Sequence, residues 1–329
     1  MTMRPLRATR LAPLAAAFLI AQTAAGLADS YPQAPIKLVI PLASGGATEN
    51  LARIAGTDAS ATLGQPIIIE NRPGASGTIA SATVAKATPD GHTLLFANFA
   101  THAVAPTMFT SLRYDPIKDF APVSYLASSP HLLLVSSDLK AQSVAELVAL
   151  AKSMPGKLNY ASSGVGSPLH LAGEYFNATA GTQIVHVPYK SSGPALIDLM
   201  SGRVQMMFDN LSTALPYVQS GKLRALAVTS NQRSALAPDV PTVIESGLPG
   251  FETYGWWGVL APAQTPPAAI EKLSAAYMGA IKTPGVVAQL TAQGYIPIGS
   301  NPAAFAKHIE SEIAKWRPII KSTGLVVSQ

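Results

Sequence analysis

Two short loops rich in glycine and serine carry the residues with the clearest potential for chemistry. The first, residues 42–48, follows the apolar run 36–41, and the second, residues 162–167, follows the apolar run 158–161. Each loop leads into a helical pattern, and glycine allows the backbone to approach a ligand closely. Free N–H groups and the dipole at a helix N-terminus favour an anion. One such loop is more often a plain cap and turn, whereas two facing loops could hold one anion from both sides.

The second loop has the stronger signal for a helix start. Ser167 is a natural N-cap, and Pro168 stands at the first helical position, where its missing N–H costs no hydrogen bond. His170 lies just inside this helix, where the dipole disfavours imidazolium, so we expect a neutral hydrogen-bonding or packing role. Lys190 follows a predicted strand end and could meet an anion or be solvated.

Patterns typical of catalysis or nucleotide binding are weak. The six histidines form neither HExxH nor another close ligand pair, and no serine stands in a G-x-S-x-G frame. The second loop lacks the third glycine of a dinucleotide fingerprint, and no P-loop motif occurs. Asp209, expected just after a strand, could act as a base, but a capping or turn-forming role beside Asn210 fits equally well. The enzyme alternative is an exported α/β hydrolase using Ser163 or Asp209, and because it lacks a recognisable nucleophile–base pair we expect no enzyme.

Alternating strand and helix patterns supply the elements that position these loops. Short runs rich in valine, isoleucine and leucine are each followed by a turn and a helical period, which is typical of βαβ units and mostly parallel sheets. The helical period is clear over Pro168–Ala180, with Gly181 as its stop, and over residues 144–154, where Ser143 and Glu146 form a capping box. The predicted strands are residues 36–41, 67–70, 93–98, 158–161, 184–187, 204–208 and 223–229.

This number of strands exceeds a single small sheet, so the sequence predicts an α/β protein of two lobes. Two long extended segments, residues 125–135 and 251–262, are the candidate connections. If both cross between the lobes, lobe 1 comprises residues 29–130 and 254–329, and lobe 2 comprises residues 131–253. Trp256 and Trp257, in the second connection, could line a cleft or pack in a core.

Residues 1–28 have the pattern of a cleaved signal peptide. Three arginines precede a short apolar run broken by Pro13, followed by small residues up to Ala28, whereas a membrane anchor would need about 20 apolar residues. Removing this segment lowers the formal net charge from +5 to +2. The remaining basic residues are scattered, so we expect no nucleic-acid partner. The absence of cysteine excludes disulfides and thiolate metal sites, and we expect a soluble periplasmic chain without metal or cofactor.

Ordered segments along nearly the whole chain, from Tyr31 to Trp316, are more specific together than any single motif. The segments are Ile36-Lys-Leu-Val-Ile-Pro with Gly45-Gly46, Glu70-Asn-Arg-Pro-Gly-Ala, Pro89-Asp-Gly-His-Thr-Leu-Leu, Tyr114-Asp, Asp119-Phe, Ser162-Ser-Gly-Val-Gly-Ser, His186-Val-Pro-Tyr-Lys, Met207-Phe-Asp-Asn, Gly221-Lys-Leu-Arg-Ala-Leu-Ala-Val-Thr, Pro238-Asp-Val-Pro-Thr and Ala261-Pro-Ala. With these segments the chain resembles the Bug-type (TctC-like) periplasmic solute-binding proteins of tripartite tricarboxylate transport systems.

The resemblance implies a two-lobed periplasmic-binding-protein fold, type II-like, in which each lobe is a mostly parallel sheet flanked by helices and two crossover strands join the lobes. It implies a monomer that closes on a small carboxylate and delivers it to the membrane subunits of a transporter. The carboxylate would be a di- or tricarboxylate, an acidic amino acid or an aromatic acid. The positions that match the family's carboxylate-binding loops are Ser44, Gly45, Gly46, Ala47, Thr48, Ser162, Ser163, Gly164, Gly166 and Ser167. The positions that would face the distal part of the ligand are Thr101, His102, Tyr189, Lys190 and Asp209.

Four positions depart from the family pattern. Leu42 stands where Phe is more frequent, Glu49 where Asp is usual, and Ser76 and Ser191 where Gly is common. Leu42 changes the cleft wall and Ser191 changes the second-lobe turn, so these departures concern the identity of the ligand rather than the fold. The same fold could also serve a sensor that presents its liganded form to a signalling partner.

Overall fold

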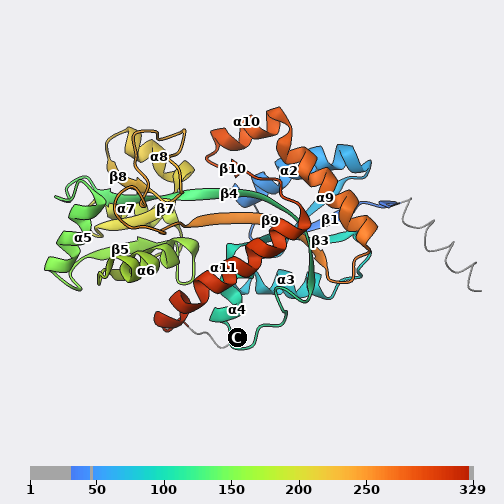
Figure 1. The fold of residues 1–329 in the computed structure, drawn as a ribbon, viewed down its shortest axis with the longest axis horizontal. Helices are drawn as coiled ribbons and strands as arrows, with labels where there is room; N and C mark the ends of the chain where they lie inside the picture. Colours follow the sequence, from blue (N-terminus) through green and yellow to red (C-terminus); the bar gives the residue numbers. More distant parts are fainter. Residues whose placement is uncertain (1–30, 45–46, 326–329) are drawn as a thin grey trace, which may run out of the picture.

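One mixed β-sheet runs through both lobes of the molecule (Figure 1). The computed structural model describes residues 31–44 and 47–325, and within them ten strands follow the order β2-β1-β3-β9-β4-β7-β5-β6, with β8 and β10 also paired to β4. The strands are β1 (Ile36–Ile40), β2 (Ile67–Asn71), β3 (Thr93–Asn98), β4 (Phe120–Ser136), β5 (Asn159–Ser162), β6 (Val185–Pro188), β7 (Met206–Asn210), β8 (Leu223–Val228), β9 (Tyr254–Pro262) and β10 (Ile296–Pro297).

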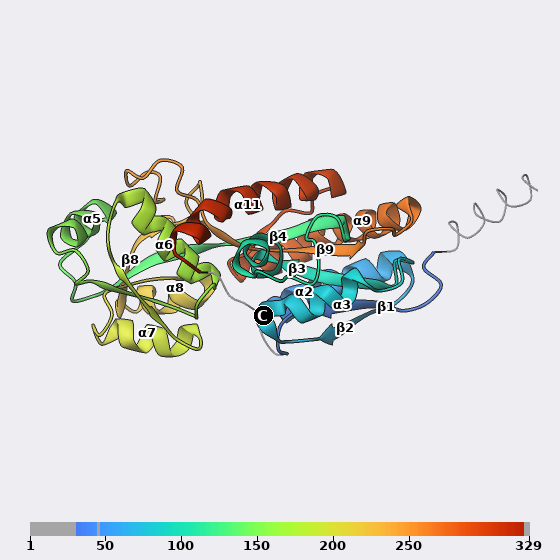
Figure 2. The ribbon, with the colours of Figure 1, turned by 90° about the horizontal axis from the view of Figure 1, so that it is seen from below.

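Helices cover both faces of this sheet (Figures 1 and 2). They are α2 (Ala47–Leu63), α3 (Thr78–Ala85), α4 (Ala105–Met108), α5 (Val144–Ser153), α6 (Pro168–Ala180), α7 (Ser192–Met200), α8 (Leu211–Gln219), α9 (Pro267–Lys282), α10 (Pro284–Ala292) and α11 (Pro302–Ser322), with short turns η1 (Ala75–Gly77) and η2 (Ala100–Val104). None of the helices in the described ranges is long and apolar enough to cross a bilayer. The predicted signal peptide, residues 1–28, lies outside the described residues.

Lobe 1 forms around the parallel strands β2, β1 and β3. Successive side chains of a strand point to opposite faces, so a strand that is covered on both faces is apolar along nearly its whole length. In β1, Leu38 and Ile40 pack in a cluster with Leu51 of α2 and Leu273 of α9, whereas Val39 belongs to the cluster on the other face. The apolar run in the sequence therefore marks a central strand of the sheet.

Lobe 2 repeats this arrangement around the parallel strands β6, β5 and β7. Leu133 of β4 packs in one cluster with Leu147 of α5, and Leu132 packs in the opposite cluster with Leu196 of α7. The two-lobed α/β fold expected from the sequence is thus confirmed. Antiparallel pairs occur where β4 and β9 meet the parallel strands of each lobe.

Strand β4 changes its partners in the middle of its length. Residues 120–130 pair with β9, ending in the pair Pro130–Tyr254, and from His131 onward the strand pairs with β7 and β8. Strands β4 and β9 therefore correspond to the two predicted crossover segments. The division of the chain into lobe 1, residues 29–130 and 254–329, and lobe 2, residues 131–253, remains a prediction.

Helix α11 adds a contact between the lobes. Its last turns lie beside α6 in both views (Figures 1 and 2), with the rings of Trp316 and Tyr175 at 5.8 Å and edge to face. The ammonium group of Lys315 lies 5.6 Å from the Tyr175 ring, and it donates a hydrogen bond to the backbone oxygen of Glu252. This side of the molecule is packed, which distinguishes it from the cavity between the lobes described below.

Two local predictions differ from the structure in detail. The hydroxyl of Ser143 accepts a hydrogen bond from the Glu146 N–H as expected, but the Glu146 carboxylate accepts from the N–H of Gln142 instead of closing a capping box on Ser143. Strand β7 is displaced by two residues from the predicted 204–208, because Asp209 and Asn210 continue the pairing with Leu132 and His131 of β4. The expectation that Asp209 follows a strand was therefore wrong, since it lies within β7.

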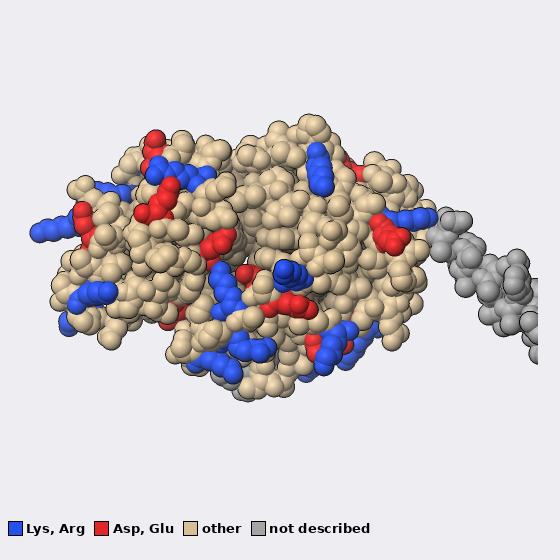
Figure 3. All heavy atoms as spheres, viewed as in Figure 1, with Lys and Arg blue, Asp and Glu red and all other residues tan. Residues whose placement is uncertain are grey.

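The surface is sparsely charged. On the face shown in Figure 3, Lys and Arg are interspersed with Asp and Glu, and most of the surface is uncharged. Several charges are paired, such as Arg233 with Glu245 at 2.9 Å and Arg203 with Asp198 at 2.8 Å. Exposed pairs of this kind contribute little to stability.

Candidate functional site

Four strand ends and two tryptophans line one cavity between the lobes. The carboxyl ends of strands in open α/β sheets are the places where ligands bind, and here β1 and β3 contribute from lobe 1 and β5 and β7 from lobe 2. The cavity has a volume of about 190 Å³. Its lining residues are Leu42, Thr48, Asn98, Phe99, Ala100, Ser163, Pro168, Leu169, Asn210, Gly255, Trp256 and Trp257.

Three helix N-termini and the start of one short turn meet at this cavity. Thr48 belongs to the first turn of α2, Leu169 to that of α6, Asn210 immediately precedes α8, and Ala100 begins the turn that leads into α4. Backbone N–H groups at such ends, together with the helix dipole, favour a negative charge. The arrangement therefore provides a positive potential without a charged side chain.

Two backbone N–H groups, one in the second loop and one in the first turn of α6, are free to meet a ligand. In α6, the Ser167 hydroxyl accepts the N–H of His170 at 3.2 Å, as its predicted N-cap role requires. Among the hydrogen bonds of the described residues, the N–H groups of Ser163 and Leu169 have no acceptor. Both residues line the cavity, so an anion between the lobes would lie within reach of two donors from lobe 2.

Other residues of this loop are bonded within the loop or to histidines of α6 and β6. The Gly164 N–H donates to the Ser162 hydroxyl at 3.2 Å, and the Gly166 N–H donates to Nδ1 of His170 at 3.0 Å. Ser162 is fully buried, and its hydroxyl lies 2.7 Å from Nε2 of His186. Of the predicted residues in this loop, only Ser163 lines the cavity; the others shape the backbone around it.

Two stacked histidines form hydrogen bonds with this loop. The rings of His170 and His186 lie 3.8 Å apart, and Tyr160 stacks on His186 at 4.9 Å while its hydroxyl donates to Glu174 at 2.5 Å. Burial lowers the pKa of His170 to about 3, with a further contribution from His186, and burial lowers the pKa of His186 to about 4. The lowered pKa values favour the neutral form of both rings at pH 7. His170 both accepts the Gly166 N–H and stacks on His186, in line with the hydrogen-bonding or packing role expected for it.

Leu42 and Thr48 are the residues of the first loop that line the cavity. Leu42 is 41% exposed at the cavity, and the buried hydroxyl of Thr48 accepts a hydrogen bond from Nε1 of Trp257 at 3.1 Å. Ser44 is exposed, and α2 begins at Ala47. Gly45 and Gly46, the glycines of this loop, lie outside the described residues.

Thr101 and His102 are buried behind the cavity. The Asn98 side-chain oxygen accepts the N–H of Thr101 at 3.1 Å, and Thr101 in turn lies 2.9 Å from Nδ1 of His102. Neither side chain is exposed, and burial lowers the pKa of His102 to about 3. Thr101 and His102 therefore do not face the cavity. They hold Asn98, which does line it.

The predicted distal residues of lobe 2 lie outside the cavity lining. The Tyr189 hydroxyl donates to Asp198 at 2.7 Å, and Lys190 is exposed. Asp209 is fully buried and accepts a hydrogen bond from the Ser192 hydroxyl at 2.8 Å, and burial raises its pKa to about 6. Its neighbour Asn210 faces the cavity in its place, as the alternation of side chains along β7 requires.

Comparison with known proteins assigns the family. A family model described as the tripartite tricarboxylate transporter family receptor, TctC, matches residues 51–325. The chain belongs to the TctC family. It is 37% identical over 298 residues to protein BugT of Bordetella pertussis, covering 90% of this chain and 91% of that one.

Solved structures of similar proteins agree in fold. A protein of R. palustris solved with adipate is 37% identical, with a TM-score of 0.78 over 91% of this chain and 100% of that chain. MatC of Rhodopseudomonas palustris, solved with bound malate, is 36% identical, with a TM-score of 0.75 over 88% of this chain and 100% of that chain. The fold of this TctC-family chain is therefore that of periplasmic binding proteins.

Sequence reasoning missed several residues that line the cavity. Asn98 is the last residue of β3, and its side chain accepts the N–H three residues later, as the side chain of an N-cap does; Phe99 and Ala100 follow it. Gly255 carries no such signal. The sequence left open whether the two tryptophans line a cleft or pack in a core, and the structure shows both. Trp256 is buried and Trp257 is half-buried, and both line the cavity.

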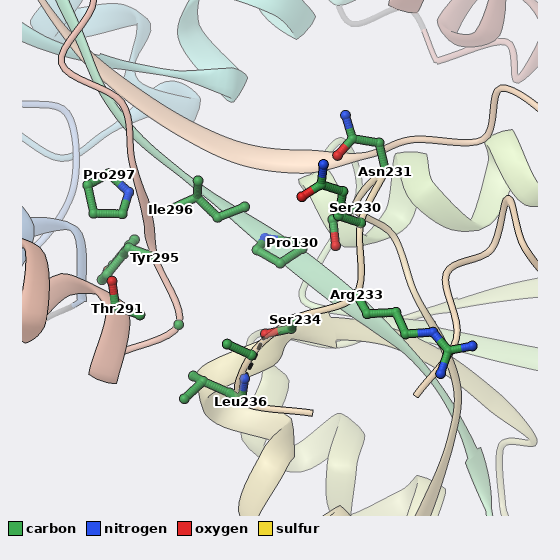
Figure 4. A pocket seen from close by; sticks show the side chains of 13 residues that line it. Pro130, Ser230, Asn231, Arg233, Ser234, Leu236, Thr291, Tyr295, Ile296 and Pro297 are labelled. Carbon is green, nitrogen blue, oxygen red and sulfur yellow. Dashed lines mark hydrogen bonds between the residues drawn. The ribbon is translucent and has the colours of Figure 1, made fainter. Parts of the chain in front are cut away.

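A second cavity, of about 310 Å³, lies on the opposite edge of β4. Figure 4 shows Pro130 between the segment that carries Ser230 and Leu236 and the segment that carries Tyr295, Ile296 and Pro297. None of the predicted site residues lines it. Among the described residues, no three His, Cys, Asp or Glu side chains gather in a way that could hold a metal ion in either cavity.

Proposed function

We propose that this chain is a periplasmic solute-binding protein that captures a small carboxylate between its lobes and delivers it to the membrane subunits of a tripartite tricarboxylate-type transporter. The observation that carries the proposal is the meeting of three helix N-termini, those of α2, α6 and α8, at one cavity between the lobes whose lining has no charged side chain. Two similar proteins were solved with adipate and malate, which are carboxylates.

In this proposal the ligand carboxylate lies between the first loop and the N-terminus of α6. The donors from lobe 2 are the N–H groups of Ser163 and Leu169 and the Ser163 hydroxyl, and Thr48 at the start of α2 lines the cavity from lobe 1. A hydrogen bond to a charged group contributes about 1.5–3 kcal/mol, and a helix end contributes about 0.3–1 kcal/mol. After the costs of association and lobe closure, a dissociation constant near micromolar, about −8 kcal/mol, is reasonable. The ligand stabilises the closed arrangement by contacting both lobes.

We further propose that residues 1–28 are removed on export, that the mature protein acts as a monomer, and that it binds its ligand without catalysis. The Ser163 hydroxyl, which lines the cavity, has no histidine bonded to it, and in the Ser162–His186 pair the serine is fully buried while the histidine is half-buried. An acyl-transfer reaction needs an accessible nucleophile held by its base. The geometry therefore favours binding over hydrolysis.

Isothermal titration calorimetry on the mature protein tests this function. A panel of mono-, di- and tricarboxylates, amino acids and aromatic acids should contain at least one ligand that binds with one-to-one stoichiometry. Ser163→Ala should weaken the binding of that ligand. Ser153 is an exposed serine on α5, and Ser153→Ala should leave the affinity unchanged. Turnover of an ester or amide together with no binding of any carboxylate would overturn the proposal.

A further inference from the structure

The second cavity also lies between the lobes, and it is called the hinge cavity here to distinguish it from the ligand cavity. Residues 230–236, which follow β8, line it from lobe 2, and residues 291–297, which include β10, line it from lobe 1, with Pro130 of β4 between them (Figure 4). Its volume of about 310 Å³ exceeds the volume of the ligand cavity, about 190 Å³. An engineered cavity of about 150 Å³ holds benzene. The hinge cavity therefore has room for a ring with a polar substituent.

Strand β4 separates the two cavities. Ser128 pairs with Ile296 on one edge of the strand and with Trp256 on the other. Ile296 lines the hinge cavity, and Trp256 lines the ligand cavity. Beyond Pro130, β4 is flanked in the same way by β8 and β7 of lobe 2. The cavities thus lie on opposite edges of one strand, at the place where that strand passes from one lobe to the other.

Each wall of the hinge cavity is bonded to a crossover strand. The N–H of Asn231, on the lobe 2 wall, donates a hydrogen bond to the Tyr254 hydroxyl of β9 at 3.2 Å. The backbone oxygen of Gly294, on the lobe 1 wall, accepts a hydrogen bond from the Ser129 hydroxyl of β4 at 3.2 Å. A molecule held between these walls would contact both lobes beside the strands that join them.

Tyr295 connects the hinge cavity with the ligand cavity. It is a buried residue that lines the hinge cavity, and its ring packs edge to face on Trp257 at 5.4 Å. Trp257 lines the ligand cavity, and its Nε1 donates a hydrogen bond to Thr48 at 3.1 Å. Packed side chains of this kind can carry energetic coupling between two sites.

One buried hydroxyl of the hinge cavity lacks a partner. Ser230 is 3% exposed, and its Oγ atom forms no hydrogen bond within the part of the chain that the structure describes. A buried polar atom without a partner costs free energy, so such atoms are rare in folded proteins. A hydroxyl or amide group of a bound molecule would satisfy the Ser230 hydroxyl, which can donate and accept.

The rest of the lining favours a neutral molecule. Arg233 alone is charged among the described residues that line the cavity, and its Nε donates to a carboxylate oxygen of Glu245 at 2.9 Å. Figure 4 shows its guanidinium group pointing away from Tyr295. A buried charge on the ligand would therefore meet no free counter-charge. The apolar part of the lining is Pro130, Ala235, Leu236, Tyr295, Ile296 and Pro297.

We propose that the hinge cavity is a second binding site, which takes a small neutral molecule with an apolar body and an amide or hydroxyl group, and that its occupation strengthens carboxylate binding in the ligand cavity. The site stands apart from the proposed function, whereas the coupling rests on it. Because the cavities lie on opposite edges of β4, a rotation of the lobes in the plane of the sheet that narrows the ligand cavity widens the hinge cavity. A molecule that fills the hinge cavity therefore favours closure on the carboxylate, and the carboxylate favours that molecule in return.

Benzamide and its isosteric cation benzamidinium test the site through the amide chemical shifts of the mature protein. Benzamide should shift the N–H resonances of Ser230, Asn231 and Tyr295 in a saturable way, and it should bind at least about tenfold more tightly than benzamidinium. A carboxylate between the lobes acts on these resonances only indirectly, so its own effect on them should be small. Benzamide shifts that do not saturate, or that occur at Ser163 and Leu169 instead, would overturn the site.

Ser230→Ala tests the role of the unpartnered hydroxyl. The variant should weaken benzamide binding by about three- to tenfold, which corresponds to one neutral hydrogen bond. Its midpoint of urea denaturation should stay the same, because the hydroxyl has no partner to lose. Ser153→Ala, at the exposed serine on α5, should change neither quantity. Unchanged benzamide affinity in Ser230→Ala would overturn the assignment of the site.

Calorimetry with a carboxylate ligand tests the coupling. Saturating benzamide should raise the carboxylate affinity by about fivefold or more. Ile296→Trp, at a 41% exposed side chain that lines the hinge cavity, should fill part of the cavity and also raise this affinity. Its control is Ile197→Trp, at a 60% exposed side chain on α7 outside both linings, which should leave the affinity unchanged.

The outcomes separate the coupling from the proposed function. A carboxylate that binds with an affinity unchanged or lowered by benzamide would overturn the coupling and leave the proposed function standing. No binding by any carboxylate would overturn the proposed function and the coupling together. The benzamide shifts and Ser230→Ala would still decide whether the hinge cavity is a binding site.

Discussion

The backbone N–H of Gly166 donates a hydrogen bond to Nδ1 of His170, at 3.0 Å, and this bond ties the ligand loop of lobe 2 to the helix that follows it. His170 stacks on His186 at 3.8 Å, and His186 lies 2.7 Å from the Ser162 hydroxyl at the start of the same loop. Both ends of the loop are thereby fixed to one pair of rings. The free N–H groups of Ser163 and Leu169 are positioned before a ligand arrives.

His170→Leu should weaken ligand binding by about tenfold or more and lower the free energy of unfolding by about 1–3 kcal/mol, because the Gly166 N–H loses its acceptor in a buried place. His170→Asn keeps an oxygen near the position of Nδ1 and should retain most of the affinity. Calorimetry and urea denaturation on both variants measure the two effects.

The control for this pair is His308→Leu, in lobe 1. His308 is half-buried and stacks on Tyr125 at 4.2 Å, but it does not line the cavity. This variant should lower stability and leave the affinity unchanged. Loss of affinity in His308→Leu equal to that in His170→Leu would show a general effect of destabilisation instead of a specific role for the loop.

The two helix caps at Ser167 and Ser143 provide a matched comparison. Each hydroxyl accepts one N–H bond at 3.2 Å, Ser167 at the start of α6 and Ser143 at the start of α5. Replacing either serine by alanine should lower the free energy of unfolding by about 1 kcal/mol. Only Ser167→Ala should also weaken ligand binding, because it loosens the α6 end that carries Leu169. Equal affinities for both variants in calorimetry would mean that the α6 end does not hold the ligand.

Stability should fall as the pH is lowered from about 6.5, the ordinary histidine pKa, toward about 4. Burial holds the pKa of His102 and His131 at about 3 and that of His186 at about 4, so in this range the unfolded chain binds protons that the folded chain does not. The folded state is therefore favoured at higher pH. Thermal melts between pH 7.5 and pH 4.5 measure the effect. A melting temperature that rises as the pH is lowered would contradict the prediction.

Asp209 should affect the pH dependence of stability in the opposite direction to the buried histidines. Its raised pKa, about 6, means that the folded chain binds a proton between about pH 3.8 and 6 that the unfolded chain has released, so its contribution to stability is lost as the pH rises through 6. Asp209→Asn keeps an acceptor for the Ser192 hydroxyl and removes the buried charge. The variant should be more stable than the wild type at pH 7.5, by about 1 kcal/mol or more in urea denaturation, with a smaller gain at pH 5. A lower stability at both values of pH would mean that the ionised carboxylate is needed.

The residues that could be predicted from the sequence are those with strong local signals. Strand β3 and helix α6 have the expected bounds, because an apolar run, an N-cap serine with a following proline, and a C-terminal glycine each constrain the backbone locally. Strand β7 is displaced because its register depends on β4, which is far away in the sequence. Local patterns do not contain such pairing.

The candidate site was predicted at the level of loops, and less well at the level of side chains. Sequence position cannot show that Thr101 and His102 turn inward to hold Asn98, or that the Gly166 N–H is used by His170. The role of Trp257 also depends on its bond to Thr48, 209 residues away in the sequence. These are tertiary contacts, and they decide which groups of each loop are left to meet a ligand.

The most direct test of the central claim is the set of backbone amide chemical shifts of the mature protein on addition of a carboxylate ligand found by calorimetry. The account predicts that the N–H resonances of Ser163 and Leu169 shift strongly, because these N–H groups bond to the carboxylate. The N–H group of Gly166 stays bonded to His170, so its resonance should shift less. Ser230 and Asn231, beside the second cavity, should shift least. Largest shifts at Ser230 and Asn231, with Ser163 and Leu169 unchanged, would contradict the claim that the helix N-termini between the lobes hold the carboxylate.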